Sequence, residues 1–60
     1  MDIAGAKQRG YQALLVAKGT QGSVWQVYLA GRLFDHQEFG TEAEAWQHAI
    51  DLINADQYNH

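Results

Sequence analysis

Two short apolar segments on either side of a glycine-bounded turn constrain the fold of this chain more than any other feature. Residues 11–17 read YQALLVA and residues 23–30 read SVWQVYLA, with the sequence GTQG at positions 19–22 between them. Short apolar runs with β-branched and aromatic residues are typical of strands, and the two glycines favour a hairpin turn. A second tight turn is predicted at residues 30–32, followed by a more polar third strand over residues 33–39. The pattern therefore predicts an antiparallel three-stranded meander.

A capping box marks the start of one helix after the third strand. Thr41 stands three residues before Glu44, so its hydroxyl is expected to accept from the backbone N–H of Glu44 while the glutamate carboxylate reaches back. We expect the helix to end between Asn54 and Tyr58. The positions predicted to form its buried face follow three- and four-residue spacing: Ala43, Trp46, Ala49, Ile50 and Ile53. The chain is therefore expected to adopt an α+β fold of β-β-β-α order, with the C-terminal helix packed on one face of the sheet.

Residues 1–10 show no sustained periodicity and are expected to form a flexible N-terminal arm. Residues 11–60 then form a single domain, because a chain of 60 residues is too short for two. The core is expected to draw on both layers, from Leu14, Val16, Trp25, Val27, Leu29, Phe39, Trp46, Ile50 and Ile53. The pattern alone does not decide which face of the first strand joins this core.

Both faces of the first two strands carry apolar residues, which a single helix does not cover. A helix with its side chains is about 10 Å across, so it shields one face of the sheet and leaves the other open. The open side is expected to be an interaction surface, unless the N-terminal arm folds across it or it forms a ligand groove. The residues predicted to form this surface are Tyr11, Ala13, Leu15, Gln26 and Tyr28. We therefore predict a non-catalytic protein-interaction module that self-associates, as a homodimer, through an apolar sheet face or an edge strand.

The amino-acid composition narrows how so small a domain gains stability. The chain has no cysteine, which excludes disulfides and thiolate zinc sites, so a partner chain is the expected source of the missing stability. It also has no apolar run long enough to span a membrane and no signal peptide pattern, so we expect a cytoplasmic protein.

Neither a catalytic site nor a metal site is expected. The three histidines, His36, His48 and His60, follow no metal-binding spacing. Glu44, His48 and Asp51 are interpreted as a solvated helix face. Asp35, His36 and Glu38 offer acid and base groups, but no cysteine nucleophile accompanies them, and Ser23 and Thr41 have structural roles in a turn and a cap. We therefore expect no enzyme activity, no metal and no cofactor.

A tryptophan on the second strand, a glycine turn and an F-x-T-x-x-x-A-x-x-x-A pattern at the start of the helix form a signature. Its residues are Trp25, Gly31, Phe39, Thr41, Ala45 and Ala49. From Val24 to Ile53 the chain resembles the small DNA-binding modules of tyrosine-recombinase N-termini and plant ethylene-response-type factors, and also short bacterial domains with the same signature. The resemblance implies a three-stranded sheet with one helix and a sheet face that enters the major groove. It would make Trp25, Gln26, Tyr28 and Arg32 the contacts to bases or phosphates.

The charge balance opposes this implied DNA binding. The formal net charge is −3, and Asp35 and Glu38 stand on the third strand, where phosphates would approach. The residues available for nucleic acid are Lys7, Arg9, Lys18, Trp25, Gln26, Tyr28 and Arg32. Binding of duplex DNA by the sheet face is therefore the alternative to the interaction module. A further alternative is a small acidic accessory or inhibitor protein that occupies the nucleic-acid groove of a larger machine.

Overall fold

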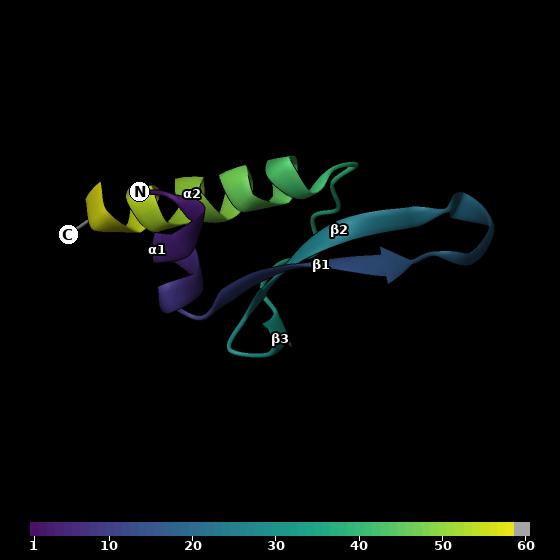
Figure 1. Ribbon diagram of the computed structural model, residues 1–60, viewed down its shortest axis with the longest axis horizontal. Coiled ribbons are helices and arrows are strands. Elements are labelled where there is room, and N and C mark those ends of the chain that lie inside the picture. Colours follow the sequence, from purple (N-terminus) through teal and green to yellow (C-terminus); the bar gives the residue numbers. More distant parts are fainter. Residues whose placement is uncertain (59–60) are drawn as a thin grey trace.

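The structure, a computed structural model, describes residues 1–58 as a three-stranded antiparallel sheet with two helices (Figure 1). In chain order the elements are α1 (Ile3–Gln8), β1 (Tyr11–Ala17), the 3-10 turn η1 (Gly19–Gln21), β2 (Ser23–Leu29), β3 (Arg32–Leu33) and α2 (Glu42–Tyr58). The strands lie in the order β1-β2-β3, and both pairs are antiparallel. The predicted β-β-β-α arrangement is confirmed, and the additional helix α1 precedes it.

The helix α1 occupies part of the segment that was expected to be a flexible arm. The Asp2 carboxylate caps it by accepting from the backbone N–H of Gly5 at 2.8 Å. Ala6 is fully buried against Trp46 and Ile53 of α2, so α1 packs on the helix-covered side of the sheet. The alternative in which the arm folds across the open face is therefore not the arrangement of α1 in the structure. A six-residue helix with one buried alanine has no apolar periodicity, so its sequence does not reveal it.

The register between β1 and β2 decides which face of β1 joins the core. Ala13 lies opposite Val27, which is fully buried under α2, so the odd-numbered residues of β1 share the covered face. The even-numbered residues Leu14 and Val16 point to the other face, where Leu14 is 41% exposed. The expected placement of Leu14 and Val16 in the core is therefore wrong, because alternate strand residues point to opposite faces.

Small side chains bring α2 close to the sheet. Ala45 and Ala49 are buried against Val27 in one cluster, and Trp46 and Ile53 are buried in a second one. Ala43, expected on the buried face, is exposed, because the buried stripe of α2 begins at Ala45. Of the expected core, Val27, Trp46 and Ile53 are confirmed as buried, whereas Trp25, Leu29, Phe39 and Ile50 are partly buried.

Thr41 caps α2, as the capping box predicted. Its hydroxyl oxygen accepts from the backbone N–H of Glu44 at 3.2 Å. The same hydroxyl donates to Glu44 Oε1 at 3.0 Å. The reciprocal contact therefore runs between the two side chains, rather than from the carboxylate to a backbone N–H.

The third strand is two residues long, much shorter than the expected strand over residues 33–39. Asp35 Oδ1 accepts from the backbone N–H of Gln37 at 3.2 Å, and this side-chain turn bends the chain out of the strand. The chain returns to the sheet at Phe39, which exchanges two backbone hydrogen bonds of 2.8 and 2.9 Å with Trp25. A local side-chain bond thus competes successfully with the strand ladder.

The turn between β2 and β3 holds an alanine in a strained conformation. Ala30 has φ 54° and Gly31 has φ 80°, the pattern of a type I′ turn, in which both central residues have positive φ. Asparagine adopts this conformation more readily than alanine. We expect Ala30→Asn to raise the free energy of unfolding by about 0.5–1 kcal/mol, which thermal unfolding would detect as a midpoint about 2–8 °C higher.

Gly31→Ala is the matched control for the turn. An added methyl group at Gly31 meets no atom within 4 Å, so only backbone strain acts there, and we expect lower stability. An Ala30→Asn protein no more stable than the wild type would show that the turn is not strained.

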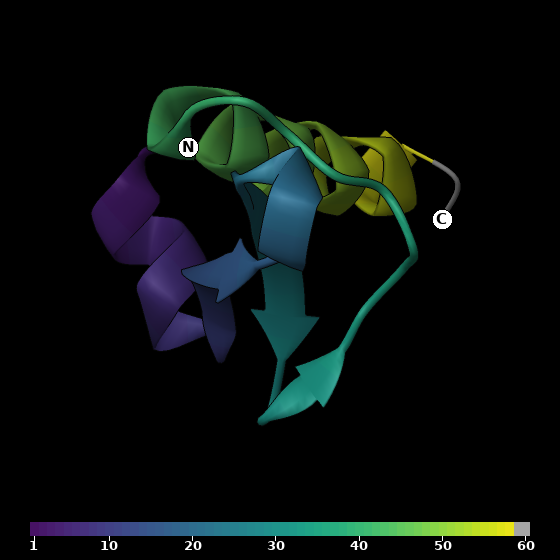
Figure 2. The same ribbon diagram turned by 90° about the vertical axis from the view of Figure 1, so that its right-hand side faces the viewer.

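The molecule is elongated because the hairpin of β1 and β2 extends past α2. Its extents are 42 × 17 × 17 Å and its radius of gyration is 11.8 Å, against about 10.4 Å expected for a compact chain of this length. Figure 1 shows the outer end of the hairpin beyond the start of α2, and Figure 2 shows α2 over the hairpin, with α1 beside β1 and β3 on the far side. A two-stranded hairpin without a second layer is marginally stable.

Candidate protein-interaction edge

β1 is an edge strand whose outer backbone groups have no strand beside them within residues 1–58. The backbone N–H and C=O of Trp25 in β2 both bond to Phe39, on the side of β2 away from β1. Trp25 and Leu15 therefore lie opposite each other without backbone hydrogen bonds between them. The N–H and C=O of Leu15 therefore point away from β2. By the same alternation, the residues with outward backbone groups are Tyr11, Ala13, Leu15 and Ala17. We call this row of groups the β1 edge.

The β1 edge lacks the sequence features that usually protect an edge strand, although α1 lies beside its inner end (Figure 2). Its sequence YQALLVA contains no charge, proline or glycine, whereas edge strands are commonly protected by lysine, proline or a bulge. Lys18 follows directly, but its ammonium lies 2.7 Å from Glu38 Oε2. Glu38 precedes Phe39, which is bonded to the far side of β2, so the lysine reaches away from the β1 edge. The strand itself therefore remains uncharged.

Two leucines flank the β1 edge on opposite faces of the sheet. Leu15 is 58% exposed and Leu14 is 41% exposed. Leu15 lies on the face that α2 covers further along the strand, and Leu14 lies on the face without a helix. A strand added to this edge would therefore meet large apolar side chains on both faces.

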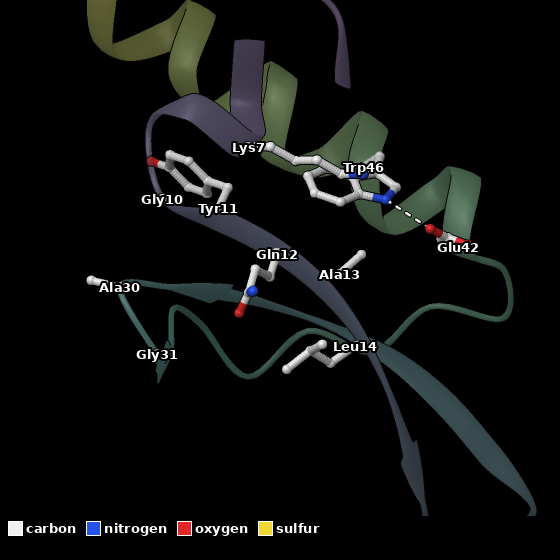
Figure 3. Close-up of a pocket in the computed structure, with 10 residues that line it drawn as sticks. All are labelled: Lys7, Gly10, Tyr11, Gln12, Ala13, Leu14, Ala30, Gly31, Glu42 and Trp46. Carbon is white, nitrogen blue, oxygen red and sulfur yellow. Dashed lines mark hydrogen bonds between the residues drawn. The ribbon is translucent and has the colours of Figure 1, made fainter. Parts of the chain in front are cut away.

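A groove of about 550 Å³ runs along the inner half of the β1 edge. It is lined by residues 10–14, by Lys7, Glu42 and Trp46 of the two helices, and by Ala30 and Gly31 of the turn between β2 and β3. The Trp46 indole N–H donates to Glu42 Oε2 at 3.0 Å, and Lys7 Nζ lies 5.6 Å from the Trp46 ring centroid. Figure 3 shows Ala13 on the Trp46 side of β1 and Leu14 on the other side. Ala13 and the largely buried Trp46 border one side of this groove, which we call the edge groove.

A chain of polar contacts occupies the face without a helix. Gln26, only 6% exposed, accepts from the Tyr28 hydroxyl at 3.2 Å and donates to Glu38 at 3.4 Å. The Lys18 ammonium, which bonds to Glu38, holds the pKa of that carboxyl below its usual value. Within residues 1–56 no buried side-chain nitrogen or oxygen lacks a partner. The buried polar groups of this face are therefore engaged within the chain.

The five residues predicted to form the interface do not share one surface. Tyr11 and Ala13 pack against the buried clusters under α2, whereas Gln26 and Tyr28 lie on the opposite face. Leu15 alone combines exposure with a position on the β1 edge. The error has a physical cause: odd-numbered residues of β1 face odd-numbered residues of β2, so Tyr11 and Tyr28 point in opposite directions. Leu14, which was expected in the core, is exposed and adjoins this edge; two consecutive strand leucines cannot both enter a core on one face.

The seven residues available for nucleic acid are also spread over different surfaces. Trp25 packs under α2, on the face opposite Gln26 and Tyr28. The basic side chains make contacts within the chain: Lys7 with Trp46, Arg9 with the Gly5 carbonyl at 3.4 Å and Lys18 with Glu38. Arg32 is exposed at the start of β3. The described structure therefore presents no single basic sheet face.

The titratable side chains of α2 form local contacts. His48 Nε2 lies 2.7 Å from Asp35 Oδ2, and its ring centroid lies 5.0 Å from that of Phe39, so this histidine holds the 35–37 turn against α2. It was expected on a solvated face, but it is partly buried. Within residues 1–58, no three histidine, aspartate or glutamate side chains come together as a metal site. His60 lies outside the described residues.

Among the described residues, neither helix is both long enough and apolar enough to cross a membrane.

Comparisons of the chain with known protein families, with curated proteins and with solved structures found no match. The similarity to DNA-binding modules therefore stays a prediction from the sequence signature.

Proposed function

We propose that this protein is a non-catalytic self-association module in which two copies pair through their β1 edges. The observation that carries the proposal is Leu15, a large apolar side chain 58% exposed on an uncharged edge strand. Addition of a strand to an exposed sheet edge is a common mode of protein recognition, in which main-chain hydrogen bonds supply affinity. Antiparallel pairing of two copies would join the two three-stranded sheets into one continuous sheet.

The shape of the chain favours a second copy as the partner. The outer end of the hairpin has no helix over it (Figure 1), and a 60-residue chain buries a small core. A symmetric dimer uses the same surface on both copies. Antiparallel pairing would place the unsupported outer end of each hairpin beside the helix-covered part of the other copy. Each copy would then supply the support that the other lacks.

Leu15→Lys tests this function directly. Each copy would lose one leucine that is buried in the dimer interface, so the loss of binding free energy is counted twice. We therefore expect the dimer dissociation constant to rise about 100-fold or more. Because Leu15 is exposed in the single chain, the fold should be retained, which circular dichroism would verify. Sedimentation equilibrium over a concentration series would measure association of the wild type and the variant.

Gln37→Lys is the charge-matched control, because Gln37 is exposed in the segment between β3 and Phe39, across β2 from the β1 edge. It should leave the dissociation constant unchanged. The proposal fails if the wild type sediments as a monomer at tens of micromolar, or if Leu15→Lys associates as strongly as the wild type.

A further inference from the structure

We infer that the two copies pair about a two-fold axis at Leu14, which seats Leu15 of each copy in the edge groove of the other. This inference rests on the proposed self-association and adds its register. It follows from three properties of β1: the direction of its backbone groups, the order of its large and small side chains, and the position of the edge groove.

The direction of the backbone groups limits the register. Only the odd-numbered residues of β1 point their N–H and C=O outward, so antiparallel pairing must place odd-numbered residues opposite one another. The two-fold axis then lies midway between the two copies of a single residue, which is paired with its own equivalent. An axis at Leu14, the middle of Tyr11–Ala17, is the choice that pairs the whole strand. An axis at Ala13 or Leu15 leaves two residues of each strand unpaired.

On the face that carries the odd-numbered residues, the order of side-chain sizes favours the same register. With the axis at Leu14, Leu15 lies opposite Ala13 of the second copy and Tyr11 lies opposite Ala17, so each large residue of this face meets a small one. An axis at Ala13 sets Tyr11 opposite Leu15 and two alanines opposite each other. An axis at Leu15 sets two leucines opposite each other and two alanines together. Alternation of large and small residues fills space more evenly than either arrangement.

The edge groove then receives a defined side chain. Leu15 of the second copy would lie about 5.5 Å from Ala13 between Cα atoms, on the same face of the joined sheet. Ala13 borders the groove on the Trp46 side of β1 (Figure 3), so the leucine side chain enters the groove beside Ala13. On the other face, Leu14 of each copy meets its equivalent across the axis. No charged side chain of β1 is buried by this pairing.

Single cysteine variants test the register, because the natural chain contains no cysteine. With the axis at Leu14, two Leu14→Cys residues form a pair without backbone hydrogen bonds, with Cα atoms about 4.5 Å apart. That spacing allows a disulfide. Gln12→Cys and Val16→Cys are the matched controls, since each would lie about 13 Å along the strand from its own equivalent.

We expect Leu14→Cys to form a disulfide-linked dimer on mild oxidation, seen on non-reducing gels. Neither control should do so alone, but an equimolar mixture of Gln12→Cys and Val16→Cys should form a mixed dimer. If the wild type is dimeric and Leu14→Cys does not cross-link, the register is overturned while the proposed function stands. If the wild type is monomeric, both are overturned.

Ala13→Leu tests the edge groove itself. The larger side chain would fill the groove at position 13 from within the same copy, so we expect the dimer dissociation constant to rise at least about tenfold. Circular dichroism and thermal unfolding would verify that the variant folds. An Ala13→Leu protein that folds and dimerises as tightly as the wild type would show that the groove does not receive Leu15.

Discussion

Trp46→Ala is expected to lower the free energy of unfolding by about 3–5 kcal/mol, the largest effect of any single substitution that we predict. Trp46 is 4% exposed and packs with Ala6 and Ile53, so it joins α2 to α1. A chain of 60 residues has a total stability of only about 3–9 kcal/mol. Chemical denaturation at fixed protein concentration would therefore show a variant that is largely unfolded or close to it.

Trp46→Phe separates packing from hydrogen bonding. Phenylalanine keeps most of the buried ring but cannot donate to Glu42, a bond of 3.0 Å in the structure. We expect this variant to lose about 1 kcal/mol, much less than the alanine variant. Equal stability of the alanine and phenylalanine variants would contradict a core centred on this ring.

Ala6→Asp is expected to lower the free energy of unfolding by about 2–3 kcal/mol, because it places a carboxylate in an apolar site. Ala6 is fully buried, and its neighbours Trp46 and Ile53 offer it no charged partner. To hydrate the carboxylate, α1 would have to leave α2 and expose both side chains. Denaturant unfolding would measure the loss, and faster amide exchange in residues 3–8 would locate it.

Ala4→Asp is the control for α1, since Ala4 is exposed on the same short helix. It adds the same charge near the helix N-terminus, where an acidic residue is favourable. We expect its stability to equal or slightly exceed that of the wild type. If both aspartate variants are equally stable, α1 does not contribute to the core.

The hydrophobic pattern of the sequence predicted only part of the candidate interaction edge. The excess of apolar residues in the first two strands predicted that a single helix would leave apolar surface exposed, and Leu14 and Leu15 are exposed in the structure. The pattern did not identify Leu14, because both faces of β1 carry apolar residues and either one is suitable for a core. Nor did it show that the Lys18 ammonium reaches Glu38, since the two residues are far apart in the chain.

By itself, the sequence determined the elements that depend on near neighbours. The hairpin, the tight turn at Ala30 and the cap at Thr41 all follow from residues a few positions apart, because turn geometry and capping bonds are local. Only the tertiary structure decided which face of β1 meets α2, where α1 docks and which edge stays unpaired. These outcomes depend on register and on contacts between distant segments. A shift of one residue exchanges the two faces of a strand without changing its local pattern.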